Sequence, residues 1–278
     1  MKYANFLSVK PSVYDIDYYL GECDGYQEFV ASKGTVLPRR LAVSLERARV
    51  RPGMRVLDVG CGRGESLIWL TNQGARSWGI DYSEVALALA SEAIRAINLN
   101  NGDSCLLIMA NSRHLPFVDK SFDMVLMLDV IEHLYAWELE QTLKEIWRVL
   151  KPKGRLIIHT APNLWYYKFG YPIYRFFKRL QGVHLPKDPR ERFRYHRLVH
   201  VNEQSPYSLM RALRNAKFQP YIWLTDIHQR WKHDSILMNI FGWIATHVFP
   251  LNLIFCNDIF AEARKIEKLM GNWRKQGE

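Results

Sequence analysis

The chain has 278 residues, 48% of them hydrophobic, and 38 Lys and Arg against 28 Asp and Glu give a formal net charge of +10. This length and composition allow a sizeable core in one domain with insertions, and the charge favours anionic partners such as nucleic acid, phospholipid or a phosphorylated substrate. The cysteines Cys23, Cys61, Cys105 and Cys256 lack C-x-x-C or zinc-finger spacing and the N-terminus lacks an export signal, so we expect reduced thiols in a cytoplasmic protein.

The first 35 residues interleave aromatic and acidic side chains, among them Tyr14, Tyr18 and Tyr19. Their pattern predicts a helix over residues 17–32, and an apolar rhythm predicts a second helix over residues 37–48. Arg51, Pro52 and Gly53 then form a turn that leads into the first strand.

The next stretch is typical of a buried strand, a glycine turn and a helix. Residues 55–59 form an apolar run, Gly60, Gly62 and Gly64 follow at alternate positions, and residues 66–73 have a helical pattern. Glycine without a Cβ lets the backbone adopt a positive φ and lets a ligand lie directly on the main chain. We therefore predict that a nucleotide-like cofactor binds at this turn.

Two acids indicate which kind of cofactor binds. Asp58 stands at the end of the first strand, and the spacing G-x-G-x-G differs from the G-x-G-x-x-G of dinucleotide sites. A carboxylate there would repel a diphosphate but would attract a ligand that carries an ammonium group. Asp81 ends the next predicted strand, residues 76–80, where its oxygens can accept hydrogen bonds from both hydroxyls of a ribose.

Strands and helices continue to alternate along the chain, which predicts a doubly wound, mostly parallel α/β sheet. Ser83 is a candidate N-cap for the helix that follows. The further predicted elements are helices at 84–97, 137–149 and 206–215 and strands at 105–109, 122–128, 155–160, 218–224 and 258–264.

Two insertions interrupt this alternation. Residues 161–200 mix aromatic and cationic side chains, and residues 226–256 include a largely apolar stretch at 236–255. We divide the single domain into an N-terminal cap (1–35), a cofactor-binding core (36–160), the basic aromatic insertion (161–200), the C-terminal part of the sheet with the apolar insertion (201–266) and a tail (267–278).

Rings interleaved with cations suit the headgroup boundary of a membrane. The apolar stretch approaches the length of a membrane span, but Asn239, His247, Pro250 and Asn252 interrupt it and the chain must return to complete the sheet. We expect instead an apolar lid that dips into a leaflet or roofs an acceptor pocket, and a helix packed on the body of the domain is the alternative.

Together these motifs resemble those of the class I S-adenosylmethionine (SAM) methyltransferases, and the type 11 and ubiquinone-pathway members in particular. Besides the glycine turn and Asp81, the landmarks are Leu-Pro-Phe at 115–117, Ser-Phe-Asp at 121–123, Asp-Val-Ile-Glu-His-Leu at 129–134 and Arg-Val-Leu-Lys-Pro-Lys-Gly at 148–154. These landmarks in the order of the family are a far more specific signal than one glycine loop. The resemblance implies a Rossmann-like sheet of seven strands whose last strand is antiparallel.

The resemblance also implies SAM as the cofactor and assigns residues to its parts. Asp58 would reach the ammonium group, Asp81 the ribose and Tyr82 the adenine, and the N-terminal segment with Tyr18 and Tyr19 would close over the cofactor or simply pack against the sheet. The cofactor-binding residues implied are Asp58, Gly60, Cys61, Gly62, Gly64, Asp81, Tyr82, Asn111, Ser112 and Asp129. Asn111 stands where the family usually has an acid, so this adenine contact loses its charge.

The motif at 129–133 carries the candidate chemistry. His133 could take a proton from a hydroxyl acceptor, with Glu132 and His200 as the other catalytic candidates. The motif also resembles the E-x-x-E-H of ubiquinone-pathway O-methyltransferases, in which a divalent cation would polarise the hydroxyl, but its first position is Asp129 and we assign no metal ligand. Structural roles, as helix caps or as contacts to the methionine part of SAM, are the alternatives for these side chains.

We therefore expect a SAM-dependent methyltransferase, acting on a hydroxyl of a small-molecule, lipid or lipid-linked acceptor such as a glycan or isoprenoid. We place it in the cytoplasm, peripheral on the inner face of the cell membrane and in contact with anionic lipid. The chain has no Asn/Asp-Pro-Pro-Tyr/Phe box after the fourth strand, which argues against an amine on a nucleic-acid base as the target. An RNA methyltransferase that uses the basic second half is the alternative enzyme, and a SAM-binding partner protein is the non-enzyme alternative.

Overall fold

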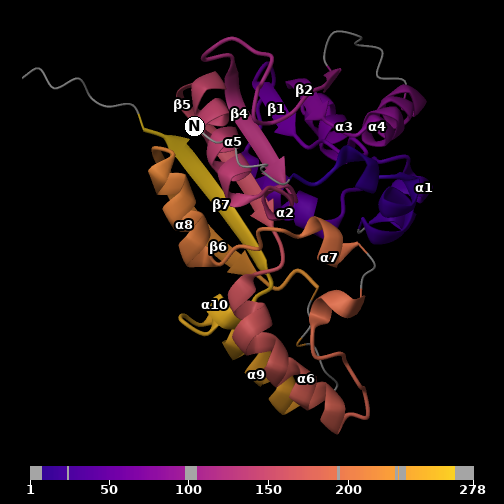
Figure 1. The fold of residues 1–278 in the computed structure, drawn as a ribbon, viewed down its shortest axis with the longest axis vertical. Helices are drawn as coiled ribbons and strands as arrows, with labels where there is room; N and C mark the ends of the chain where they lie inside the picture. The colour runs from indigo at the N-terminus through magenta and orange to yellow at the C-terminus, as the bar shows by residue number, and fades with distance from the viewer. Residues whose placement is uncertain are drawn as a thin grey trace, which may run out of the picture.

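The computed structural model describes residues 8–23, 25–97, 105–192, 195–228, 231 and 236–266. Its strands form one seven-stranded sheet in the order β3-β2-β1-β4-β5-β7-β6, in which β7 runs antiparallel to both neighbours (Figure 1). The strands are β1 (Arg55–Val59), β2 (Arg76–Asp81), β3 (Cys105–Met109), β4 (Phe122–Leu128), β5 (Leu150–Thr160), β6 (Phe218–Thr225) and β7 (Asp258–Lys265). The expected doubly wound α/β sheet with an antiparallel last strand is confirmed.

Helices cover both faces of the sheet, because successive side chains of a strand point to opposite faces. Leu57 and Val59 of β1 face a core built with α5 and α8, whereas Val56 faces a second core built with α2, α3 and α4. The helices are α1 (Tyr26–Ser32), α2 (Arg39–Ala48), α3 (Glu65–Asn72), α4 (Glu84–Ala96), α5 (Ala136–Val149), α6 (Tyr171–Leu180), α7 (His196–Val199), α8 (Pro206–Asn215), α9 (Ile236–His247) and α10 (Asn252–Phe255).

Three elements differ in extent from the prediction. The helix expected over 17–32 is split into a π-helix (Tyr18–Glu22) and α1, and the helix expected from residue 37 begins at Arg39 because the residue before a proline disfavours helical backbone. The fifth strand begins at Leu150 instead of residue 155, since Leu150 already pairs with Phe122 of β4. Here sheet pairing overrides a Lys-Pro-Lys-Gly stretch that is typical of a loop.

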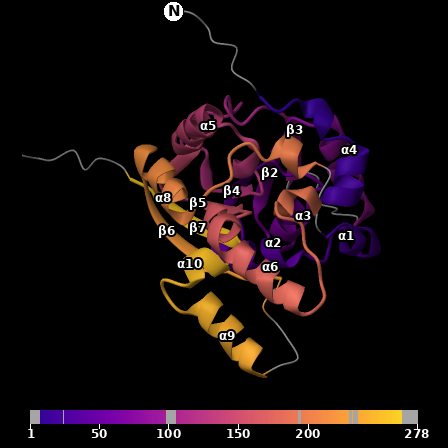
Figure 2. The same ribbon diagram turned by 60° about the horizontal axis from the view of Figure 1, so that its bottom comes forward.

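The two insertions pack against each other and form one lobe, which we call the insertion lobe: residues 164–185, Trp231 and residues 236–256. It contains α6, α9 and α10 and projects beyond the carboxyl ends of β5 and β6 (Figures 1 and 2). Its small core is aromatic, with Tyr166, Tyr171 and Trp231 packed among Phe255 and Ala245. Segments about 70 residues apart in the sequence therefore stabilise each other.

Within the described residues, no helix has the length and apolar content needed to cross a membrane. The expected tail at 267–278 and the first seven residues of the expected cap lie outside the described residues.

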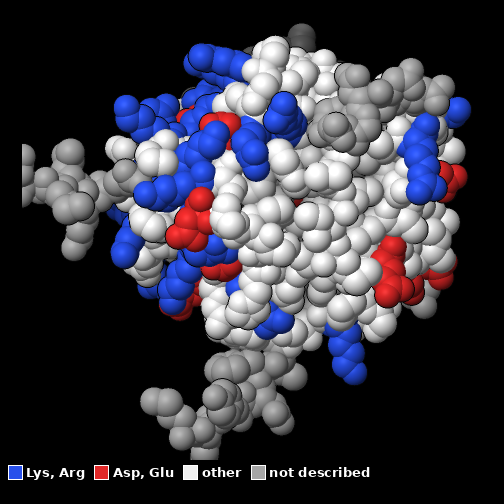
Figure 3. Space-filling view, turned by 90° about the horizontal axis from the view of Figure 1, so that it is seen from above, with Lys and Arg blue, Asp and Glu red and all other residues white. Residues whose placement is uncertain are grey.

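Positive charge gathers at the amino edge of the sheet. Figure 3, a view from above, shows Lys and Arg on the side where α8 and β7 lie, with Asp and Glu among them. Lys151 and Lys153 at the start of β5 and Lys217 at the start of β6 belong to this edge. It lies opposite the carboxyl ends of the parallel strands.

Candidate active site

A cavity of about 320 Å³ lies at the carboxyl ends of β1, β2 and β4. Open α/β sheets place ligands at this edge, where neighbouring strands diverge to their helices. Tyr14, Tyr18 and Tyr19 of the N-terminal segment line it together with residues that follow the three strands. The predicted residues Asp58, Gly60, Cys61, Gly62, Asp81, Tyr82, Asn111, Ser112, Asp129 and His133 all contribute to its wall.

The glycines of the turn between β1 and α3 have two roles: one leaves space for a ligand and another allows close packing. Gly62 has φ of 51°, and a Cβ there would meet no atom of the described chain, so the backbone is open towards the cavity. Gly64, also predicted to touch the cofactor, does not line the cavity. A Cβ at Gly64 would lie 3.0 Å from the Cβ of Ala90, so this glycine allows α3 and α4 to approach closely.

Asp58 is buried at the end of β1, lines the cavity and has one oxygen without a hydrogen-bond partner among the described residues. Ser66 of α3 donates a hydrogen bond to Oδ2, whereas Oδ1 is buried and has no hydrogen-bond partner in the described chain. Burial raises the pKa of this carboxyl to about 7, and the Ser66 hydrogen bond partly opposes that rise. A ligand cation next to Oδ1 would compensate for the burial, so the site fits an ammonium group.

Asp81 at the end of β2 is held rigidly by main-chain donors. The amide of Gly62 donates to Oδ2 at 3.1 Å and the amide of Ser83 donates to Oδ1 at 2.9 Å. Each oxygen keeps a further lone pair, so the carboxyl can also accept from two adjacent ligand hydroxyls. Beside it, Tyr82 lines the cavity with its ring centroid 5.5 Å from that of Tyr14.

Asn111 and Ser112, expected at an adenine edge, are already engaged with the protein. Asn111 Oδ1 accepts from the backbone N and the Nε of Arg113, both at 3.0 Å, and the Ser112 hydroxyl lies 2.8 Å from the Thr142 hydroxyl. The amide oxygen therefore fixes the loop after β3, a role that the sequence did not indicate.

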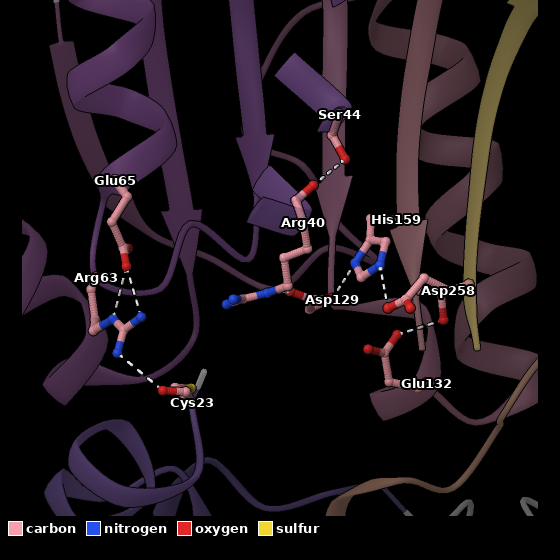
Figure 4. A network of polar contacts seen from close by, with 10 residues as sticks. Cys23, Arg40, Ser44, Arg63, Glu65, Asp129, Glu132, His159 and Asp258 are labelled. Carbon is pink, nitrogen blue, oxygen red and sulfur yellow. Dashed lines mark hydrogen bonds and ion pairs between the residues drawn. The ribbon is translucent and has the colours of Figure 1, made fainter. Parts of the chain in front are cut away.

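Asp129, which follows β4, belongs to a partly buried charge network that Figure 4 shows. Its Oδ2 accepts from Arg40 Nε of α2 and its Oδ1 pairs with His159 Nδ1 of β5, while His159 Nε2 lies 3.4 Å from Asp258 Oδ1 of β7. Burial alone would lower the pKa of His159. The carboxylates of Asp129 and Asp258 together outweigh this effect and raise the pKa to about 10. Burial alone would raise the pKa of Asp129. The positive charges of His159 and Arg40 outweigh this effect and hold the pKa well below its usual range.

Because of this network, Asp129 stays ionised and orients the side chain of Arg40. It holds Arg40, a cavity-lining side chain that sequence reasoning missed because nothing in the pattern of α2 distinguishes it. His159 and Asp258 were missed for the same reason, since they lie on strands with no motif around them.

A second buried pair fastens the N-terminal segment over the cavity. Arg63 binds Glu65 at 2.7 Å, and its Nη1 donates to the carbonyl oxygens of Tyr19 and Cys23, each at 3.3 Å (Figure 4). Arg63 lies in the glycine turn itself, so the turn that lines the cavity also binds the N-terminal segment. This link was not predicted.

Glu132 does not line the cavity. It is buried, and the hydroxyl of Thr160 donates to its Oε2 at 2.8 Å. Burial raises the pKa of Glu132 above its usual value, and the negative charge of Asp129 adds to this effect. Its backbone oxygen accepts from the amides of Val201 and Asn202 at 2.9 and 3.1 Å, so Glu132 anchors the segment that carries His200.

His133 lines the cavity on the β4 side, and His200 packs behind it. The centroid of the His133 ring lies 5.7 Å from that of Tyr14 and 5.1 Å from that of His200. Burial lowers the pKa of His133 to about 4 and that of His200 to about 2, so both rings are neutral at pH 7. The Nδ1 atoms of both rings are buried without a hydrogen-bond partner among the residues that the structure describes.

Glu132, His133 and His200 each offer one possible metal-ligand atom, and these atoms lie within 4.8 Å of one another. His200 thus stands where the sequence motif suggested Asp129, which faces Arg40 and His159 instead. Burial and the charge of Asp129 favour a protonated Glu132 carboxyl, which is a poor metal ligand, and the Thr160 hydrogen bond only partly opposes them.

Comparisons with known proteins concern the family and the fold of the chain. Residues 57–158 match a family described as a methyltransferase domain. Methyltransferase GfsG of Streptomyces halstedii is 37% identical over 114 residues, which are 41% of this chain and 40% of that protein. A demethylmenaquinone methyltransferase of Bacillus mycoides is 32% identical over 130 residues, 45% of this chain and 53% of the relative. The matches therefore span about half the length of these relatives or less.

Among solved structures, the geranyl diphosphate C-methyltransferase of Streptomyces coelicolor has the same fold. That crystal structure contains Mg²⁺, geranyl diphosphate and S-adenosyl-L-homocysteine, and the likeness covers 95% of this chain and 91% of the other with a TM-score of 0.59. The sequences are 16% identical, so the likeness concerns the fold.

Proposed function

Because the chain carries a class I SAM-dependent methyltransferase domain, we propose that it transfers the methyl group of SAM to a hydroxyl of a small-molecule, lipid or lipid-linked acceptor. One observation carries the proposal: a single cavity is lined by a buried carboxyl with an unsatisfied oxygen, Asp58, and by a neutral histidine with an unsatisfied nitrogen, His133. The first suits the cationic end of the cofactor and the second suits an acceptor proton.

The residues around the glycine turn fit SAM. When bound, SAM supplies a methyl group on a sulfonium centre that is already activated, so the protein must orient the reactants more than activate them. Asp58 would hold the ammonium group, Asp81 the ribose hydroxyls, and Tyr82 the adenine ring. The backbone at Gly62 allows the ligand to lie against the main chain.

His133 is the proposed base. Nδ1 of its neutral ring would take the proton of the acceptor hydroxyl when that oxygen receives the methyl group of SAM. His200 packs against the ring of His133, and Glu132 holds the segment that carries His200. Both act by positioning, since neither lines the cavity.

The acceptor is proposed to be apolar at its reacting end, because Tyr14, Tyr18 and Leu134 line the cavity near His133. Two of the similar proteins are, by name, methyltransferases of demethylmenaquinone and of geranyl diphosphate, which supports an isoprenoid-type acceptor. The latter is a C-methyltransferase, so oxygen or carbon as the methylated atom has to be read from the product. We place the reaction in the cytoplasm, at the inner face of the cell membrane.

RNA bound by the cations at the amino edge of the sheet would not reach the cavity. The clustered cations of Figure 3 lie at the amino edge of the sheet, whereas the cavity opens at the carboxyl ends of β1, β2 and β4. A phosphate backbone bound by Lys151 and Lys153 would therefore not lead a base to His133.

Radiolabelled methyl transfer tests the proposal. The protein is incubated with labelled SAM and host extract, and the extract is separated into organic-soluble, water-soluble small-molecule and RNA fractions. We expect label in a small molecule or lipid, strong loss of label with His133→Asn, and normal labelling with His114→Asn, an exposed histidine outside the cavity.

Label in RNA would contradict the acceptor class. If His133→Asn labelled the acceptor as well as the parent does, His133 would not be the base. SAM binding without transfer to any fraction would favour the non-enzyme alternative. Mass spectrometry of the labelled product then distinguishes an ether from a new carbon–carbon bond.

A further inference from the structure

The insertion lobe exposes large apolar side chains along two helices. On α9 the exposed residues include Leu237 (78% exposed), Ile240 and Trp243 (59%), and on α6 they include Phe176 (59%) and Leu180. On α9, positions 236, 237, 240, 243 and 244 follow helical spacing, so they form a continuous stripe. Soluble surfaces seldom carry an apolar stripe of this length without a partner.

The inward side of α9 contains Gly242, Ala245 and the half-buried Phe241. A Cβ on Gly242 would lie 2.6 Å from the Cβ of Trp231, and the ring of Phe241 packs against those of Trp231 and Phe255. These residues hold the helix on the lobe, so the exposed stripe is not required for the packing of the lobe.

The charge of the lobe has one sign. No Asp or Glu occurs between Glu145 and Asp188, and residues 236–257 contain no Lys, Arg, Asp or Glu. The charged side chains of the lobe are the cations Lys168, Arg175, Lys178 and Arg179, on and just before α6. An uncharged apolar stripe beside four cations complements an anionic headgroup layer above hydrocarbon chains.

The lobe lies at the same edge of the sheet as the cavity. The chain enters the lobe after Thr160 of β5 and after Thr225 of β6, and it returns at Asp258 of β7 (Figures 1 and 2). The cavity lies at the carboxyl ends of the neighbouring β1, β2 and β4. A surface bound by the lobe would therefore face the edge at which the acceptor enters.

From these observations we infer that α6 and α9 dock the protein onto an anionic phospholipid surface, with the stripe of α9 lying in the headgroup boundary. The orientation rests on the proposed function, since it brings the cavity towards lipid-linked acceptors. The docking itself does not require methyl transfer and can be tested without an acceptor.

Vesicle sedimentation tests the inference. The full chain is mixed with phosphatidylcholine vesicles that either contain or lack phosphatidylglycerol. We expect it to sediment with the anionic vesicles, and Leu237→Glu with Trp243→Glu to weaken this binding about tenfold or more because two charges would enter the apolar boundary. Val36→Glu with Val118→Glu is the matched control, since both valines are exposed outside the lobe and the charge change is the same.

A second pair of variants isolates the charge contribution. Lys168→Gln with Arg179→Gln should weaken binding about fivefold for each cation removed. Lys144→Gln with Lys153→Gln, which removes two exposed cations outside the lobe, should leave binding unchanged. Calorimetry with SAM on every variant checks that the fold is intact.

Three results would overturn the inference: no sedimentation of the parent chain, sedimentation of Leu237→Glu with Trp243→Glu equal to that of the parent, or a parent dimer that the same variant converts to monomer. The last result would make this face a contact between two copies. If the chain binds vesicles but transfers no methyl group, the proposed function fails while the docking surface stands.

Discussion

The cavity has a part that we propose for the cofactor, around the glycine turn, and a part that we propose for the acceptor, around His133. The two differ in how their residues come together. The hydrogen bonds that hold the carboxyls of Asp58 and Asp81 join residues close in the sequence: Ser66 to Asp58, Gly62 to Asp81 and Ser83 to Asp81 span 8, 19 and 2 positions. On the β4 side, Tyr14, His133 and His200 meet from distant parts of the chain. A local motif can fix a cofactor, whereas an acceptor site depends on the whole fold.

This difference predicts that the two parts can be damaged separately. Variants near the glycine turn should weaken SAM binding, and variants near His133 should slow transfer while SAM still binds.

The largest effect is expected from Asp81→Ala. The change removes the acceptor of the ribose hydroxyls and leaves the amides of Gly62 and Ser83 without their partner, so SAM affinity should fall about 100-fold or more. Calorimetry measures it. Asp123→Ala, which removes a partly exposed carboxyl paired with Lys151 at the start of β4, is the control and should bind SAM as the parent does. If Asp81→Ala bound SAM with an affinity within a few-fold of the parent, the assignment of Asp81 to the cofactor would be wrong.

His133→Ala should lower the turnover number about 100-fold, the usual contribution of a positioned base, with SAM affinity nearly unchanged. Single-turnover transfer measures the chemical step directly. Equal losses of SAM affinity and turnover would show that this side chain belongs to the cofactor part instead.

The pH dependence of SAM binding sharpens the assignment of Asp58. Burial raises the pKa of its carboxyl to about 7, so the carboxylate that attracts an ammonium group forms only as the pH rises through that value. Affinity should therefore increase about tenfold per pH unit between roughly pH 5.5 and 7. Asp58→Asn should abolish the slope, and a parent profile without a slope would contradict the ammonium contact.

The smallest effect is expected from removing metal ions. Burial and the charge of Asp129 raise the pKa of Glu132, so Glu132, His133 and His200 should act without a cation. Methyl transfer in a strong chelator should equal that in untreated protein. If the chelator abolished transfer and Mg²⁺ or Zn²⁺ restored it, these three side chains would be identified as a metal site.

The same contrast explains how much the sequence could predict. The strand at 105–109, the strand at 122–128 and the Ser83 cap were predicted with their observed bounds, because apolar runs and capping residues act locally. The carboxyls of Asp58 and Asp81 were placed at strand ends for the same reason.

The remaining features depend on tertiary contacts that no local pattern encodes. Arg40 reaches Asp129 across 89 positions, and His159 reaches both Asp129 and Asp258 from the centre of the sheet. The stretch at 236–255 was recognised as apolar, but its packing against α6 required the fold.

The central claim is that one cavity holds SAM at Asp58 and Asp81 and presents its methyl group to His133. A crystal structure with S-adenosylhomocysteine tests it most directly. The account predicts the ammonium group on Asp58 Oδ1, the ribose on Asp81 and the sulfur facing Nδ1 of His133. A sulfur directed away from His133, with the ribose off Asp81, would contradict it.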